Sequence, residues 1–236
     1  MALPGTAAVA MWWQLAPDKR AEFEDWHSHE HFPERMGIPG FLRGSRWEHV
    51  DNTHHFFVLY ELEGYDVLTS PGYMERLNAP TPWSTKMMPH HQGMVRSQCT
   101  VELAHGGGMG TAVLAIRCAP APGQGDALQA RLAPVLATLP HQPGITATRL
   151  LVTRTPTTAA PTREQLIRGG DAVADWVVLV GGYDAQVLEA LRQGVLGDDA
   201  LAAMGAAPGT TAGVHKLRYV FTPADRAALG DLDALA

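Results

Sequence analysis

Hydrophobic and polar positions alternate along several segments of the chain, and each such segment predicts a β-strand. In the first, residues 7–15, one face carries Val, Met, Trp and Leu and suits a helix-covered side. The other face carries two alanines, Trp12 and a glutamine, which suit the wall of a ligand cavity. Further strands are predicted at 41–50, 54–63 and 94–103, with helices over 18–36 and within 65–91. The predicted order is β-α-β-β-α-β, that of a ferredoxin-like unit.

The second half of the chain repeats this pattern. Ala7 and Thr111 begin matching strands, and the same offset separates Phe41 from Ile145. A Pro/Thr-rich loop at 154–165 then lengthens the repeat. Helix 125–139 and strands 143–153, 175–184 and 214–222 complete the second unit. An internal repeat of this length indicates a duplicated domain, with ferredoxin-like halves at 1–105 and 106–236.

A sheet with helices on one face leaves its other face to be covered, and the second half is the obvious partner. We therefore predict an α+β protein whose tandem ferredoxin-like repeats form a dimeric α+β barrel within one chain. Its interior is expected to hold a small ligand beside Trp12. Because the fusion supplies both halves, the chain is predicted to be a monomer or a homodimer.

Composition excludes several classes of partner. The 236 residues are 46% hydrophobic and 18% charged, as in ordinary globular proteins. A net charge of −6 provides no basic surface for nucleic acid or an anionic membrane. The two cysteines form no spaced framework, and the N-terminal segment lacks a basic leader. We therefore expect a cytoplasmic protein with no nucleic-acid or membrane partner.

Three histidines at alternate positions, His27, His29 and His31, are the first candidates for chemistry. On a helix His27 and His31 share a face, whereas His29 points elsewhere. Ser28 stands where zinc peptidases have a glutamate, so no metal site is expected. A solvated polar helix end remains the alternative. A neutral imidazole can exchange a proton near neutral pH, so we assign His31 as an acid–base residue assisted by His27.

Arg46 and Glu61 lie on neighbouring predicted strands and are the other catalytic candidates. They form either a structural ion pair or a functional pair, in which Arg46 holds a carboxylate or enolate and Glu61 is a base. Most histidines lie in the first half, which places the site there and leaves the second half mainly as sheet partner. The expected substrate-binding residues are Trp12, Trp47, Tyr60, Trp83 and His90.

The stretches WHSHEHFPERMGIPGFLRGSRWEHV and YELEGYDVLTSPGYMERLNAPTPWSTKMMPH resemble the EthD-like branch of the dimeric α+β-barrel superfamily. The resemblance covers about the first hundred residues and places His31 at the family's recurrent histidine before Phe-Pro. It implies the fold. The superfamily includes cofactor-free monooxygenases, isomerases, cyclases and dehydratases, dehydrochlorinases, haem enzymes and binding modules, so its chemistry is mixed.

From these observations we expect a cofactor-independent lyase or isomerase. It would carry out isomerisation, dehydration or elimination on a small hydrophobic carbonyl or aromatic compound, with no cofactor. A haem- or metal-dependent oxidoreductase is one alternative. A non-catalytic small-molecule binding module is another.

Overall fold

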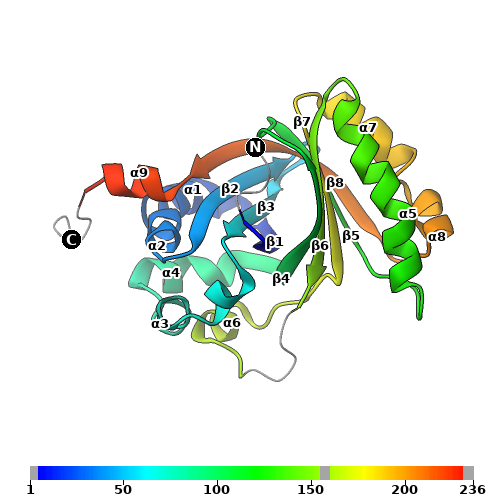
Figure 1. Ribbon diagram of the computed structural model, residues 1–236. Helices are drawn as coiled ribbons and strands as arrows, with labels where there is room; N and C mark the ends of the chain where they lie inside the picture. Colours follow the sequence, from blue (N-terminus) through cyan, green and yellow to red (C-terminus); the bar gives the residue numbers. More distant parts are fainter. Residues whose placement is uncertain (1–4, 155–159, 231–236) are drawn as a thin grey trace.

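The computed structural model describes residues 5–154 and 160–230, and a closed eight-stranded antiparallel barrel forms its centre (Figure 1). The strands are β1 (Ala7–Leu15), β2 (Phe41–His49), β3 (Asn52–Leu62), β4 (His91–Gly106), β5 (Ala112–Cys118), β6 (Ile145–Thr153), β7 (Trp176–Gly182) and β8 (Thr211–Phe221). Their order around the barrel is β1-β3-β2-β8-β5-β7-β6-β4.

Each half contributes four consecutive strands, and two seams join the halves. At one seam β2 pairs with β8, and at the other β4 pairs with β6. Both seams are antiparallel and hydrogen-bonded, so the two sheets form one continuous cylinder. This arrangement confirms the predicted fold class of tandem ferredoxin-like repeats in one intrachain α+β barrel.

Helices cover the outside of the barrel on two opposite sides (Figure 1). The first half carries η1 (Pro17–Lys19), α1 (Arg20–Trp26), η2 (His27–His31), α2 (Phe32–Met36), η3 (Tyr65–Thr69), α3 (Pro71–Asn78), α4 (Pro82–Met87) and η4 (Met88–His90). The second half carries α5 (Gly125–Thr138), η5 (Leu139–His141), α6 (Arg163–Arg168), α7 (Ala185–Gln193), α8 (Asp198–Met204) and α9 (Pro223–Ala228). In the described part of the chain, no helix has the length and apolar character needed to cross a membrane.

The helix α6 belongs to the second half but lies against the first. It packs on α3, η4 and β4, and Figure 1 shows it beside α3, away from α5 and α7. It begins within the Pro/Thr-rich loop predicted at 154–165, so residues 163–165 are helical, and residues 155–159 lie outside the described part of the chain. The lengthening of the second repeat therefore supplies a helix to the first half.

The two faces of β1 divide as its alternation predicted. Val9, Met11, Trp13 and Leu15 pack outward with the helices of the first half. Ala8, Ala10 and Trp12 point into the barrel. There Trp12 stacks on Phe57 at a centroid distance of 4.8 Å, and Trp47, Leu151, Val177 and Leu179 fill the remaining space. Side chains occupy the middle of the barrel. The expectation that the barrel interior holds a ligand is therefore wrong for this middle part.

The helix predicted at 18–36 is continuous but changes its winding. Between α1 and α2, residues His27–His31 form a π-helical turn, which is wider than an α-helical one. Within this turn the His27 and His31 rings stack, with 5.4 Å between centroids and 19° between planes. His29 points outward and contacts the Asp25 carbonyl. The predicted separation of His29 from the other two is confirmed.

Candidate functional site

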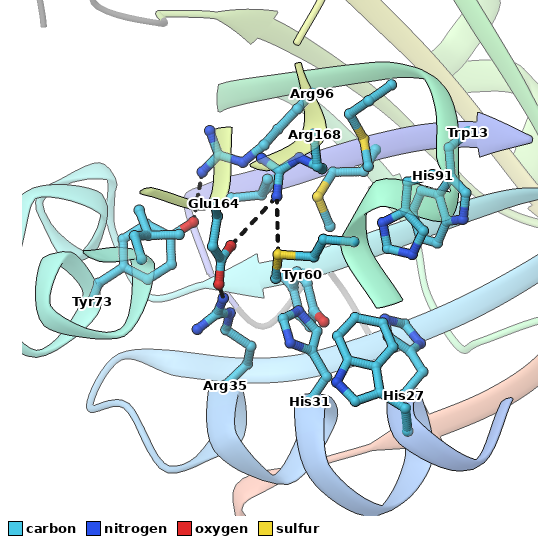
Figure 2. A pocket seen from close by; sticks show the side chains of 16 residues that line it. Trp13, His27, His31, Arg35, Tyr60, Tyr73, His91, Arg96, Glu164 and Arg168 are labelled. Atoms are coloured by element: carbon cyan, nitrogen blue, oxygen red, sulfur yellow. Dashed lines mark hydrogen bonds and ion pairs between the residues drawn. The ribbon is translucent and has the colours of Figure 1, made fainter. Parts of the chain in front are cut away.

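A small cavity lies between the first-half helices and the outer face of the sheet (Figure 2). Its volume is about 30 Å³, which is room for two or three water molecules at about 10–15 Å³ each. Its wall is made of aromatic rings, thioethers, imidazoles and paired charges. The rings and thioethers are those of Trp13, Trp26, Tyr60, Met11, Met88 and Met94.

Three buried imidazoles, those of His27, His31 and His91, line this cavity. Burial lowers the pKa of His27 and of His31 well below the usual value, and it lowers the pKa of His91 to about 3. All three rings are therefore neutral at neutral pH. Within residues 5–154 and 160–230, His31 Nδ1 and His91 Nε2 have no hydrogen-bond partner. These two nitrogens are the free proton acceptors or donors of the site.

Glu34 lies close to His31 but does not form an ion pair with it at neutral pH. His31 Nδ1 is 3.8 Å from Glu34 Oε2, which is too long for a hydrogen bond. The imidazole is uncharged, and burial raises the pKa of Glu34. His31 is instead held by packing, with its ring 4.6 Å from that of Trp26.

Tyr60 reaches the cavity from β3, as the prediction of a substrate-binding role requires. Its hydroxyl is buried and has no hydrogen-bond partner in the described part of the chain. Burial raises the pKa of this phenol, so the hydroxyl keeps its proton and remains a donor. A buried hydroxyl without a hydrogen-bond partner lowers the stability of the fold, unless a ligand or a water molecule forms that hydrogen bond.

A network of buried charges forms the remaining wall, and part of it comes from the second half. Glu164, on α6, accepts hydrogen bonds from Arg35 and from Arg168, as Figure 2 shows. Arg168 also pairs with Asp171 at 2.8 Å, and Arg96 donates to the Tyr73 hydroxyl at 2.6 Å. The second half therefore does more than partner the sheet, since its α6 closes the cavity.

The predicted catalytic residues separate into two groups. His27 and His31 line the cavity together. Arg46 lies behind His27, with Nη1 3.5 Å from His27 Nδ1 and the guanidinium over the rings of Phe23 and Tyr219. Arg46 is placed to position His27 but not to touch a ligand.

Glu61 lies inside the barrel, where Arg43 forms a two-pronged ion pair with it. The expected pairing of Arg46 with Glu61 is wrong. Arg46 stands opposite Val58, on the outer face of the sheet, whereas Glu61 stands opposite Arg43 and points inward. Successive side chains along a strand point to opposite faces. Arg46 is three positions from Arg43 on β2, so it points to the face opposite that of Arg43 and Glu61, and it cannot pair with Glu61.

Of the predicted substrate-binding residues, only Tyr60 lines the cavity. Trp12 and Trp47 face the barrel interior, and Trp83 packs at the edge of the outer core. His90 ends η4 and is half-buried, whereas the next residue, His91, begins β4 and points into the cavity. Side chains alternate along β1, so Trp13 lines this cavity and its neighbour Trp12 does not.

Sequence reasoning missed most of the wall, including Trp13, Arg35, His91, Arg96, Glu164 and Arg168. Trp13 was recognisable as a residue of the helix-covered face of its strand. Glu164 lies within the lengthened loop of the second repeat and Arg168 follows it, and this loop was the only signal for them. The meeting of α6 with the first half depends on the closed barrel.

A metal ion or a haem would need suitable ligands and room in this site. Among the described residues, no group of three or more His, Cys, Asp or Glu is placed to hold a metal ion. A porphyrin is many times larger than a cavity of about 30 Å³. The rings of His27 and His31 stack on each other and on neighbouring aromatics, leaving no slot for a planar macrocycle. The residues present do not fit a haem.

No protein-family model and no curated protein sequence matches the chain. Solved structures match it over nearly its whole length. An anthrone oxidase-like protein has 15% identity and a TM-score of 0.64, covering 96% of this chain and 97% of its own. A candidate monooxygenase from Fusobacterium nucleatum has 9% identity and a TM-score of 0.60, covering 92% and 95%. A candidate chlorite dismutase has 14% identity and a TM-score of 0.53, covering 95% and 99%.

At these identities the likeness shows the fold, which is that of the dimeric α+β barrels; the EthD-like branch gains no support from it. The comparisons contradict the expected isomerisation, dehydration or elimination. The names of the similar structures are those of an oxidase-like protein, a monooxygenase and a chlorite dismutase, which are oxidoreductases. The expectation of a lyase or isomerase is therefore wrong, and the oxidoreductase alternative has the better support.

Proposed function

We propose that this chain is an oxidoreductase that oxidises a small, uncharged aromatic molecule with dioxygen in the cavity beneath the first-half helices. One observation carries the proposal. An aromatic cavity is lined by residues whose buried polar groups lack partners in the described part of the chain, among them His31 Nδ1 and the Tyr60 hydroxyl. A ligand in the cavity would supply the hydrogen bonds that these buried groups lack.

The composition of the wall supports an aromatic substrate. Trp13 and Trp26 offer ring faces for stacking. At about 30 Å³ the cavity is too small for an aromatic ring as it stands, so it must expand to bind one. Met11, Met88 and Met94 are flexible thioethers whose rotamer changes provide that expansion. The guanidinium groups of the wall are hydrogen-bonded to acids or to Tyr73 and leave no unpaired cation for an anionic substrate.

The proposed reaction converts a methylene group that is conjugated with a carbonyl, directly or through an aromatic ring, into a ketone. His31 Nδ1 accepts a proton from the methylene carbon, and Tyr60 donates a hydrogen bond to the enolate oxygen. The carbanion transfers its electron pair to dioxygen and forms a C–O bond. His31 returns the proton to give a hydroperoxide, whose O–O bond breaks as the second methylene proton leaves. The balance is R₂CH₂ + O₂ → R₂C=O + H₂O.

The neighbours of His31 act through it. His27 stacks on the His31 ring and limits its rotation, and Arg46 lies against the far side of His27. Both are positioning residues in this proposal. The low pKa of His31 makes its imidazolium release the proton readily to the developing peroxide, and it also makes the neutral ring a weaker base. Removal of the methylene proton therefore depends on the acidity of the substrate and on the hydrogen bond from Tyr60 to the enolate oxygen.

Oxygen consumption tests the proposal, with anthrone as the probe substrate and the purified full chain as catalyst. We expect one dioxygen consumed per ketone formed, and His31→Gln should lower the rate by about 10²–10⁴-fold, as for loss of a general base. His29→Gln is the matched control, because this exposed histidine lies on the same helix and should leave the rate unchanged. Binding of anthrone without oxygen consumption would contradict the enzyme assignment and favour a binding module. Equal rates in both variants would contradict the role of His31.

A further inference from the structure

A second cavity lies at one mouth of the barrel, on the opposite face of β1 from the cavity of His31. Its volume is about 240 Å³, and Trp12, His49, His55, Arg117 and His215 are part of its wall. A cavity of about 150 Å³ is enough to bind benzene in an engineered protein. The mouth is therefore large enough for a single substituted aromatic ring.

Arg117, near the end of β5, is an unpaired cation in this wall. Its guanidinium lies 5.2 Å above the Trp12 ring and has no ion-pair or hydrogen-bond partner in residues 5–154 and 160–230. Asp175 lines a neighbouring hollow that Arg117 also borders, but the two form no ion pair. Burial alone lowers the pKa of Arg117, which stays charged. A partly buried cation without a counter-charge is costly and attracts an anion.

Three imidazoles share the cavity wall with this cation. The rings of His49, His55 and His215 contact one another with centroid distances of 5.1–5.9 Å. Burial lowers the pKa of His55 to about 4 and that of His215 to about 3, so both are neutral at neutral pH. The described wall of the cavity contains no carboxylate. Arg117 is the only lysine or arginine of the described wall.

His215 provides a defined hydrogen-bond acceptor. Its Nδ1 contacts the Gly213 carbonyl at 3.0 Å, so Nδ1 carries the proton and Nε2 is the acceptor. The ring is 1% exposed, and Nε2 has no partner in the described part of the chain. A ligand with a hydroxyl group would donate to this nitrogen.

We infer that this mouth of the barrel binds a small hydroxylated aromatic carboxylate. Arg117 holds the carboxylate with two parallel hydrogen bonds, and the ligand's hydroxyl donates to His215 Nε2. Phe57 stacks on the Trp12 ring and Arg117 lies over it, so the edge of the indole and the small side chain of Ala115 form the apolar wall beside the ligand ring. Because this site lies on the inner face of the sheet, it is separate from the proposed oxidation site.

Calorimetric titration of the full chain with 3- and 4-hydroxybenzoate tests the inference. We expect saturable binding of one molecule of at least one isomer, with a shifted indole NMR signal of Trp12. Arg117→Gln should weaken the affinity about tenfold or more, and Arg117→Lys should weaken it less. Benzoate, which lacks the hydroxyl, should bind about threefold to tenfold more weakly. Arg131→Gln is the control, since this exposed arginine lies on α5.

Several results would overturn the inference. One is the absence of saturable binding by either isomer, and another is equal affinity in Arg117→Gln and wild type. Binding of inorganic phosphate in preference to the benzoates would show a phosphate site in place of a carboxylate site. Thermal unfolding of Arg117→Gln checks that the variant is folded before its affinity is compared.

Discussion

Arg35 and Glu164 form a buried ion pair although they are 129 positions apart in the chain. Arg35 lies on α2 of the first half, and Glu164 lies on α6 of the second. Their side chains are only 3% and 5% exposed, and Glu164 also accepts from Arg168. One carboxylate therefore bridges two guanidinium groups and ties α6 over the cavity.

The first prediction concerns this tie. Glu164→Gln leaves Arg35 and Arg168 without their shared counter-charge, and should lower the free energy of unfolding by about 3–5 kcal/mol. Urea unfolding measures the change. Glu189→Gln is the control, because it removes an ion pair in which Arg192 is 38% exposed and Glu189 is 34% exposed. It should lower the free energy of unfolding by about 0–1 kcal/mol. Similar losses in the two variants would mean that the buried network contributes no more than a surface pair.

The second prediction separates stability from activity at Tyr60. Tyr60→Phe removes a buried hydroxyl without a partner in the described residues, and should raise the free energy of unfolding by about 1 kcal/mol. The same change should lower the rate of oxygen consumption by about 10²–10³-fold, as for loss of an oxyanion donor.

Tyr73→Phe is the contrasting variant. It takes the acceptor from the buried Arg96 and should destabilise the protein. If Tyr60→Phe were also destabilising, its hydroxyl would have an unseen partner.

The third prediction is a pH dependence of stability. Burial lowers the pKa of His91 from 6.5 to about 3, so between these pH values the unfolded chain binds a proton that the folded chain does not. The free energy of unfolding should therefore be highest above pH 6.5 and fall as the pH decreases. Each such histidine contributes a slope of up to about 1.4 kcal/mol per pH unit.

Urea titrations at several pH values above about 5, where ordinary carboxylates stay ionised, measure this slope. His91→Gln should reduce it by about 1.4 kcal/mol per pH unit, because one buried imidazole is gone. His29→Gln should leave it unchanged, because that ring is exposed. A slope that His91→Gln does not alter would show that His91 is not buried in its neutral form.

The fourth prediction compares two tryptophans on opposite faces of the sheet. Trp47 packs inside the barrel and donates to Ser45 Oγ at 2.9 Å, so Trp47→Phe should cost about 1–3 kcal/mol. Its kcat/KM for oxygen consumption should stay unchanged. Trp13→Phe alters the wall of the cavity and should lower kcat/KM. Loss of activity in Trp47→Phe alone would place the reaction inside the barrel.

The similarity of the two halves and the alternation along each strand were enough to predict the barrel. Period-two alternation identifies strands and assigns their faces, and the repeat indicates how two incomplete sheets cover each other. The same local rules placed His27 and His31 on one face and His29 outside, because helical spacing is a property of the nearby chain. Those features depend on residues close in sequence.

The composition of the cavity depended on contacts between distant residues, and only the tertiary structure decided it. Glu164 meets Arg35 because closure of the barrel brings α6 over the first half. Arg46 and Glu61 separate because their strands pair in a register that places them on opposite faces. A shift of one residue in that register would exchange the faces. The sequence by itself determined the elements and their faces, whereas the cavity wall was decided by register and closure, which are set by the packing of the whole chain.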